Sequence, residues 1–253
     1  MAKQFDKAIE QFNVALRLFP NSALVYSDRG NALEKLHKLD EAIADYNRAI
    51  ALAPNIFGFY HNRGGAFLRK QQFSQSLSDF ERALELNPNF ADAHCGRGNV
   101  LVVLNRYEEA FAAYDKALSI KPGSAGAWLG RGNVYSDLRR YDEAFAAYDK
   151  ALSIQPDLAE AHHGRANILH VLARNEEALS AVNRAIKLDP IDAQAHLSRS
   201  LVLLTLGQYS DAWEEYEWRR KLPVPIGNRT FTQPSLLDLD GVEGATVFVW
   251  CGR

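Results

Sequence analysis

One stretch of the sequence decides the fold: residues 125–158 read AGAWLGRGNVYSDLRRYDEAFAAYDKALSIQPDL. Small and aromatic residues recur in its second half at steps of three and four residues, the spacing of one helix face: Ala144, Phe145, Tyr148, Ala151 and Leu152. We expect one helix over 125–138 and a second over 141–154. Pro156 lacks an amide hydrogen and ends the second helix, so the next pair of helices begins after it.

The same unit recurs along the chain with a period of 34 residues. Each unit ends on a proline: Pro20, Pro54, Pro88, Pro122, Pro156 and Pro190. Each second helix carries one large residue between two small ones: Phe12, Tyr46, Phe80, Tyr114, Tyr148, Val182 and Tyr216. Upstream, one register holds Gly30, Gly64, Gly98 and Gly132 and then Ala166 and Ser200. One helix pair cannot bury its apolar face alone, so the pairs are expected to stack into a solenoid.

This pattern resembles the tetratricopeptide repeat, whose period is also 34 residues. The resemblance implies an all-α fold, a right-handed superhelical solenoid of antiparallel helix pairs whose concave groove is lined by the first helix of each pair. It covers residues 1–221, in six pairs preceded by a solitary second helix at Phe5–Phe19. The expected units are a half repeat at 1–22, full repeats at 23–56, 57–90, 91–124, 125–158 and 159–192, and a divergent last repeat at 193–221.

The sequence changes character after the repeats. Residues 222–244 are rich in proline and glycine and are expected to form a linker. Residues 245–253 begin with a β-branched and aromatic run that predicts one orphan strand. With Trp213–Arg219, this tail resembles bacterial proteins in which tetratricopeptide repeats precede a glycosyltransferase domain related to O-linked N-acetylglucosamine transferases. The resemblance implies that 245–253 is the truncated start of a missing α/β domain.

The composition is that of a folded protein without a strong charge bias. Twenty-nine basic and 31 acidic residues leave a net charge of −2, and no long basic block provides the electrostatic surface of a nucleic-acid binder. Cys95 and Cys251 are too few for a disulfide framework. The N-terminus lacks the apolar core of a signal peptide, and no apolar run is long enough to span a membrane. We therefore expect a cytoplasmic protein with no membrane or nucleic-acid partner.

Arginine occupies one register in all six complete units: Arg29, Arg63, Arg97, Arg131, Arg165 and Arg199. One register of the second helices is polar throughout and offers partners: Asn47, Glu81, Asp115, Asp149, Asn183 and Glu217. We expect a structural role, in which the arginine stems pack on the core and the guanidinium groups pair with this polar register. The alternative is an anion-binding row.

Asparagine recurs two positions after these arginines: Asn31, Asn99, Asn133 and Asn167, with Gly65 and Leu201 interrupting the row. On the repeat template this register faces the groove, where amides can bond the backbone of an extended peptide. The O-linked N-acetylglucosamine transferases carry a similar ladder of asparagines. The residues one helical turn earlier would be its neighbours: His61, Cys95, Leu129 and His163. The alternative is that each amide bonds only adjacent side chains or water.

Seven histidines invite a metal hypothesis. Three of them occupy the register of Tyr26, Tyr60 and Trp128 and are expected to replace those aromatic residues in packing: His94, His162 and His196. No cysteine or carboxylate completes a zinc set around His163 and His170. No nucleophile motif, phosphate loop or metalloprotease helix occurs either. We therefore expect no metal, no cofactor and no catalytic residue.

These observations predict a non-catalytic scaffold that binds extended peptide segments of a protein partner in its concave groove. Two other readings stay open. In the first, the chain is the substrate-recognition arm of a truncated O-GlcNAc-transferase-like glycosyltransferase. In the second, it is an assembly chaperone or a scaffold that self-associates end to end through unsealed termini. The sequence names neither the ligand nor its preferred motif.

Overall fold

The computed structural model describes residues 2–222, which fold into thirteen α-helices and one 3₁₀ helix. The helices are α1 (Ala2–Leu18), α2 (Ala23–Lys35), α3 (Leu39–Leu52), α4 (Phe57–Arg69), α5 (Phe73–Leu86), α6 (Ala91–Val103), α7 (Tyr107–Ile120), α8 (Ala125–Asp137), α9 (Tyr141–Ile154), α10 (Ala159–Val171), α11 (Asn175–Leu188), α12 (Ala193–Thr205), α13 (Tyr209–Tyr216) and η1 (Glu217–Lys221). The orphan strand expected at 245–253, and the linker after Leu222, lie outside the described residues.

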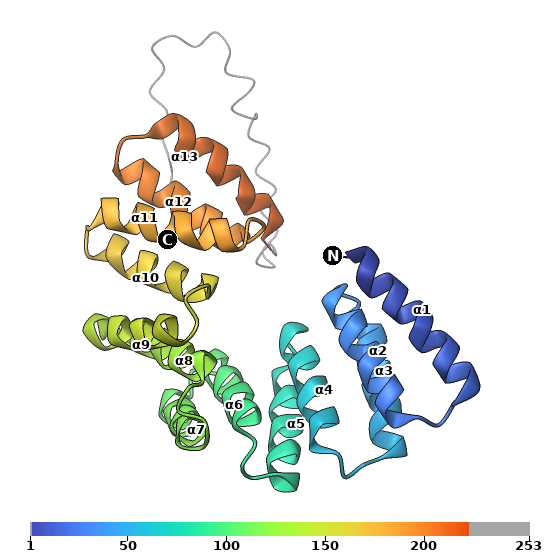
Figure 1. Cartoon of the computed structure of the whole chain (residues 1–253). Helices are drawn as coiled ribbons and strands as arrows, with labels where there is room; N and C mark the ends of the chain where they lie inside the picture. The colour runs from blue at the N-terminus through green and yellow to red at the C-terminus, as the bar shows by residue number, and fades with distance from the viewer. Residues whose placement is uncertain (1, 223–253) are drawn as a thin grey trace.

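The described residues confirm the predicted all-α solenoid. Helix α1 stands alone, and the remaining helices form six pairs, from α2 with α3 to α12 with α13 (Figure 1). The two helices predicted in the central unit are found at Ala125–Asp137 and Tyr141–Ile154, within one residue of expectation. The solitary helix predicted at Phe5–Phe19 runs from Ala2 to Leu18.

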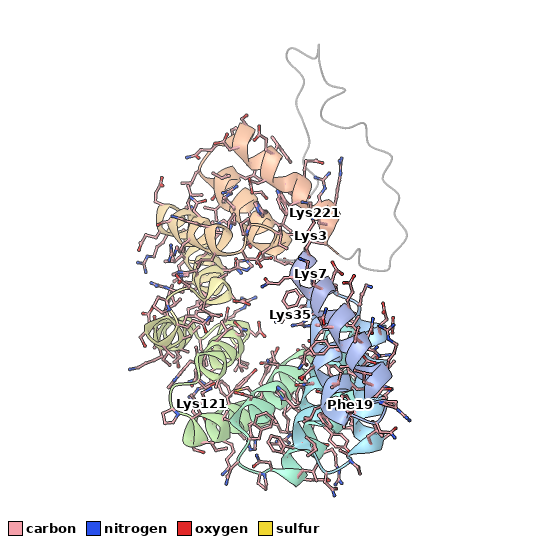
Figure 2. All side chains as sticks on the ribbon, turned by 45° about the vertical axis from the view of Figure 1, so that its right-hand side comes forward. Lys3, Lys7, Phe19, Lys35, Lys121 and Lys221 are labelled. Atoms are coloured by element: carbon pink, nitrogen blue, oxygen red, sulfur yellow. The ribbon has the colours of Figure 1, made fainter. Side chains whose placement is uncertain are left out.

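The first helix of each pair lines the inner side of the curve. Successive first helices, such as α4 and α6, approach within 8 Å between Cα atoms, whereas successive second helices in the described range do not. The solenoid therefore bends toward its first helices. The bend brings the two ends of the described chain round to face each other (Figure 1 and Figure 2), although α1 comes within 8 Å of neither α13 nor η1 between Cα atoms.

A buried aromatic side chain sets the spacing between helices in each central unit. Tyr46, Phe80, Tyr114 and Tyr148 keep no more than 2% of their surface exposed. Three of these rings lie against one glycine on the first helix of their own unit and one on the next first helix, whereas Tyr46 meets a glycine only at Gly30. A Cβ built on Gly132 of α8 would lie 2.5 Å from Tyr148, and one on Gly164 of α10 would lie 2.6 Å from the same ring. Only a glycine fits on either side of this ring.

The unit with a smaller residue in this place has larger neighbours. Val182 replaces the aromatic residue on α11 and is fully buried. The two positions that hold glycine around Tyr148 are here occupied by Ala166 and Ser198. The change in side-chain volume on the second helix is thus offset on the two first helices, which keeps the packing dense.

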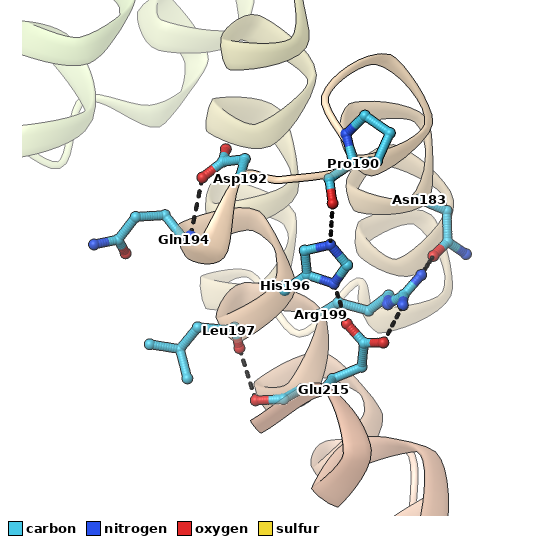
Figure 3. Close-up of polar contacts among 9 residues, drawn as sticks. Asn183, Pro190, Asp192, Gln194, His196, Leu197, Arg199 and Glu215 are labelled. Carbon is cyan, nitrogen blue, oxygen red and sulfur yellow. Dashed lines mark hydrogen bonds and ion pairs between the residues drawn. The ribbon is translucent and has the colours of Figure 1, made fainter. Parts of the chain in front are cut away.

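Hydrogen-bond donors close the turns between units. At the register expected to hold aromatic packing substitutes, side-chain donors face the carbonyl oxygen of the proline six residues earlier: Tyr60 with Pro54, His94 with Pro88, Trp128 with Pro122, His162 with Pro156 and His196 with Pro190, at 2.9–3.4 Å. His196 also contacts Glu215 at 2.5 Å through Nδ1 (Figure 3), and Trp218 stacks on its ring at 3.7 Å. The shared property of the register is therefore an N–H or O–H group as well as a flat ring.

The turns within each pair use a left-handed residue. Gly207 has φ +75°, and five other residues have φ between 57° and 59°: His37, Gln71, Asn105, Arg139 and Ala173. Alanine in this conformation is strained because its Cβ crowds the backbone, whereas glycine is not.

The aromatic–glycine packing predicts opposite effects for two substitutions in one helix. Gly132→Ala should destabilise the fold by about 2 kcal/mol, because its methyl group overlaps Tyr148. Gly126→Ala, also in α8, meets no atom within 4 Å and should stabilise by up to about 1 kcal/mol. Urea unfolding followed by circular dichroism measures both. Equal effects of the two substitutions would contradict the packing argument.

The turn geometry predicts a second pair. Ala173→Gly should raise stability by about 0.5–1 kcal/mol, because glycine removes the strain at φ 59°. Gly207→Ala should lower stability by a similar amount, since it introduces the same strain. The midpoints of thermal unfolding report both changes, and a loss of stability in Ala173→Gly would refute the strain.

Candidate functional site

A row of asparagines lies on the first helices, held by the buried tyrosines. Oδ1 of Asn99 accepts a hydrogen bond from the Tyr114 hydroxyl at 2.8 Å, and Oδ1 of Asn133 accepts one from Tyr148 at 2.9 Å. Burial raises the pKa of both tyrosines far above the ordinary value, so the hydroxyls stay protonated and donate. With its oxygen engaged, each exposed amide keeps its two N–H groups for an external acceptor.

The two ends of the row are engaged differently. Oδ1 of Asn31 accepts from the Tyr46 hydroxyl at 2.8 Å and also from Nδ2 of Asn62 at 3.0 Å. Asn167 faces a unit that has valine instead of tyrosine, and its Nδ2 lies 3.3 Å from Nε2 of His163. Within residues 2–222, hydrogen bonds leave the Nδ2 groups of Asn31, Asn99 and Asn133 unengaged. Of the predicted row, Asn167 alone has its Nδ2 engaged in the described structure.

The row is interrupted at Gly65 by a hollow of about 590 Å³. His61, Cys95 and Asn99 from the predicted set line it, together with Phe80. The other predicted groove residues lie outside this hollow: Asn31, Asn133, Asn167, Leu129 and His163. Leu129 instead packs against the core cluster around Tyr148.

Two groups at the hollow are neutral. His61 is largely buried, its Nδ1 has no hydrogen-bond partner, and its ring stands edge-on to Phe80 and Phe90 at centroid distances of 5.6 and 4.9 Å. Burial lowers the pKa of His61, which favours the uncharged imidazole. Burial raises the pKa of Cys95, whose Sγ lies 3.6 Å from Ser124 Oγ, so the thiol stays protonated.

The arginine row meets the predicted polar register, but one unit earlier along the chain. Arg63 donates to Asn47 at 2.6 Å and Arg131 to Asp115 at 2.7 Å, both on the preceding second helix. By the same step Arg29 donates to Asn13, which sequence reasoning left out. Glu217 has no row arginine as its partner in the described chain, and instead pairs with Arg219 and Arg220.

The arginines differ in a second contact. Arg29, Arg63 and Arg199 also meet a carboxylate sixteen residues later, from Asp45, Asp79 and Glu215 respectively. Alanine occupies this position in the three central units, at Ala113, Ala147 and Ala181. In those units the Nε atoms of the arginines are buried without a hydrogen-bond partner in the described structure: Arg97, Arg131 and Arg165. Nε of Arg199 is buried without a partner there as well, although its Nη2 meets Glu215. These atoms are closed to an anion from solvent, because they are buried.

One contact has the composition of a nucleophile and its base. Nε2 of His163 lies 2.8 Å from Ser198 Oγ, and Asp192 lies 3.9 Å from Nδ1 of the same ring. Ser198 stands in the middle of α12, where backbone amides bond within the helix and do not stabilise an oxyanion. The contact therefore ties α10 to α12. Across residues 2–222, no three His, Cys, Asp or Glu side chains gather to hold a metal ion, and none of the helices there is long and apolar enough to cross a membrane.

The chain resembles known proteins of one family. Two family models, both described as tetratricopeptide repeat, match it, one at residues 61–125 and 163–218 and the other at 23–56 and 125–158. No curated protein matches the chain.

Solved structures share the fold. A tetratricopeptide repeat protein from Parabacteroides merdae is 20% identical with a TM-score of 0.70, and the match covers 88% of each chain. A chain of the Cut9–Hcn1 hetero-tetramer of the APC/C is 16% identical with a TM-score of 0.79, over 88% of this chain and 44% of that one. YrrB, described as a TPR protein with an unusual peptide-binding site, is 23% identical with a TM-score of 0.50, over 74% of this chain and 96% of that one.

The buried histidine predicts a pH effect on stability. The pKa of His61 is lower in the folded state than the unfolded value of about 6.5, so the unfolded state binds more protons below that pH. The stability that depends on a neutral His61 is therefore fully present above the pKa of the unfolded state, and it is lost as the pH falls through the lower pKa of the folded state. His61→Leu, which reproduces the residue at Leu129, should therefore lose less stability between about pH 7.5 and about pH 5. The midpoints of urea unfolding of the original chain and of His61→Leu, measured at both pH values, test this. An equal loss of stability in the two proteins would disprove the effect of His61.

Proposed function

Because the chain belongs to the tetratricopeptide-repeat family, we propose that it is a non-catalytic scaffold that binds an extended peptide segment of a protein partner in its concave groove. One observation carries the proposal. The hydroxyls of Tyr114 and Tyr148 fix the oxygens of Asn99 and Asn133, and this leaves pairs of N–H donors exposed on the first helices. An extended peptide supplies a regular series of backbone carbonyl acceptors for such donors.

The supporting tyrosines make these donors more effective than free surface amides. An exposed asparagine on a flexible side chain loses rotamer freedom when it binds. Here the side chain is already restrained by a hydrogen bond to a ring that is 1% exposed. Pre-organised donors lose less entropy on binding, so a row of them adds affinity with little dependence on the peptide's side chains.

The comparisons fit this proposal at the level of the family. YrrB is described as having an unusual peptide-binding site, and the chain matched in the Cut9–Hcn1 hetero-tetramer forms part of a protein assembly. The glycosyltransferase reading rests on the tail, and no comparison supports it. Self-association through the ends and a cytoplasmic location stay predictions.

The test removes the donors and keeps the acceptors. Asn99→Asp with Asn133→Asp preserves the shape and the oxygen that each tyrosine needs, but removes all four N–H groups. A random peptide library displayed on phage is selected on the full chain, and one bound peptide without Lys or Arg is measured by fluorescence polarisation. We expect its Kd to rise by about tenfold or more, from two or more lost hydrogen bonds.

The control makes the same chemical change away from the groove. Gln75→Glu replaces an exposed amide by a carboxylate on the second helix α5 and should leave binding unchanged. Both proteins should unfold within about 0.5 kcal/mol of the original chain, since the changed groups are exposed. Retained affinity in the double variant, or equal loss in the control, would rule out the asparagine row as the binding element.

A further inference from the structure

Gly65 differs from the other glycines in the helix interiors. A Cβ on Gly30, Gly64, Gly98 or Gly132 would meet an aromatic ring at 2.5–3.3 Å. A Cβ on Gly65 would meet nothing within 4 Å, although the residue lies in the middle of α4. Glycine there weakens the helix by about 1 kcal/mol relative to alanine, and packing gives no reason for it.

The space at Gly65 arises from two substitutions that occur together. In the units with Tyr46, Tyr114 and Tyr148, the tyrosine hydroxyl bonds an asparagine on the first helix. In the α4–α5 unit the ring is Phe80, which has no hydroxyl, and the asparagine position is Gly65. The missing amide and hydroxyl widen the Gly65 side of the hollow of about 590 Å³, which extends along the groove from Glu34 to Gln155.

The walls of the hollow suit an aromatic side chain. Two of its lining residues are rings: His61 offers an edge-to-face contact, and Phe80, 2% exposed, lies behind it. The thiol of Cys95 adds a polarisable sulfur. Arg69 and Lys121 supply cations that attract the face of a ring. Two carboxylates also line the hollow, Glu34, which holds Arg69 at 3.1 Å, and Asp92.

The hollow also adjoins the proposed backbone contacts. Asn99 lines it and carries unengaged N–H groups, so a peptide bonded there places a neighbouring side chain beside Gly65. We infer that the hollow at Gly65 is a specificity pocket for an aromatic side chain of the bound peptide. This inference rests on the proposed function and deepens it, because it adds side-chain selection to a row that reads only the backbone.

A small probe tests the pocket directly. N-acetyltryptophanamide is titrated into the ¹⁵N-labelled full chain, with N-acetylleucinamide as the aliphatic comparison. We expect the tryptophan compound to shift the amide signals of Gly65, Cys95 and Asn99 at concentrations at which the leucine compound does not. Gly65→Leu, which reproduces the residue found at Leu201 in the same register, should abolish those shifts.

Gly58→Leu is the matched control. Gly58 lies in the same helix, a Cβ there also meets nothing within 4 Å, and its register holds leucine at Leu24. This variant should respond to the probe as the original chain does. Both variants should retain or gain thermal stability, since leucine favours helix over glycine. Equal shifts from both compounds, no shifts at all, or equal loss in both variants would overturn the pocket.

Peptides separate this inference from the proposed function. Replacing the aromatic residue of a library-selected peptide by alanine should weaken binding about tenfold or more to the original chain, and little to Gly65→Leu. If the binding of selected peptides depends on Asn99 and Asn133 but not on Gly65, the proposal of a pocket is wrong and that of a peptide-binding scaffold is retained. If the probe binds at Gly65 while peptide binding is unchanged in the double asparagine variant, the proposal that the asparagine row binds the peptide backbone is wrong.

Discussion

The central units of the fold depend on one packing constraint, a large aromatic ring that fits only between glycine backbones. Each ring on a second helix touches the first helix of its own unit and, in the central units, that of the next. The contact therefore sets the spacing within a pair and the stacking of one pair on the next. In the unit of Val182 the ring is replaced by a smaller side chain, and the two glycine positions hold the larger Ala166 and Ser198. From unit to unit, the combined volume of the packed side chains is therefore kept, and not the identity of any one residue.

The same constraint shapes the groove. Because the ring of Tyr114 is locked, its hydroxyl emerges at a fixed point and holds Asn99. Where the ring is Phe80, the hydroxyl is absent and the groove residue is Gly65. An amide bonded to a tyrosine hydroxyl stands in the units of Tyr46, Tyr114 and Tyr148, and the hollow lies in the unit of Phe80. Two units depart from this pairing, since Asn167 stands in the unit of Val182 and Leu201 in that of Tyr216. Where the hydroxyl and the amide are bonded, a substitution in the core is expected to change the groove.

The sequence predicts the helices well because their period repeats over the whole solenoid. The contacts between helices are harder to predict. The partner of Arg63 proved to lie one unit earlier, at Asn47, since periodicity gives the register but not the neighbouring helix. The left-handed turn at Ala173 has no glycine, so the sequence gives no signal for its positive φ. The bond between tyrosine and asparagine had a signal that could have been used, because Gly65 and Phe80 depart from the pattern in the same unit.

The most direct measurement is a double-mutant cycle between Gly132→Ala and Tyr148→Val, by urea unfolding. Together the two changes reproduce Ala166 and Val182 of a later unit. If the ring excludes a methyl group, Gly132→Ala costs about 2 kcal/mol beside tyrosine and nothing, or a negative amount, beside valine. An equal cost in both backgrounds would mean that the glycine serves another purpose, and that the aromatic ring does not set the spacing of the helices.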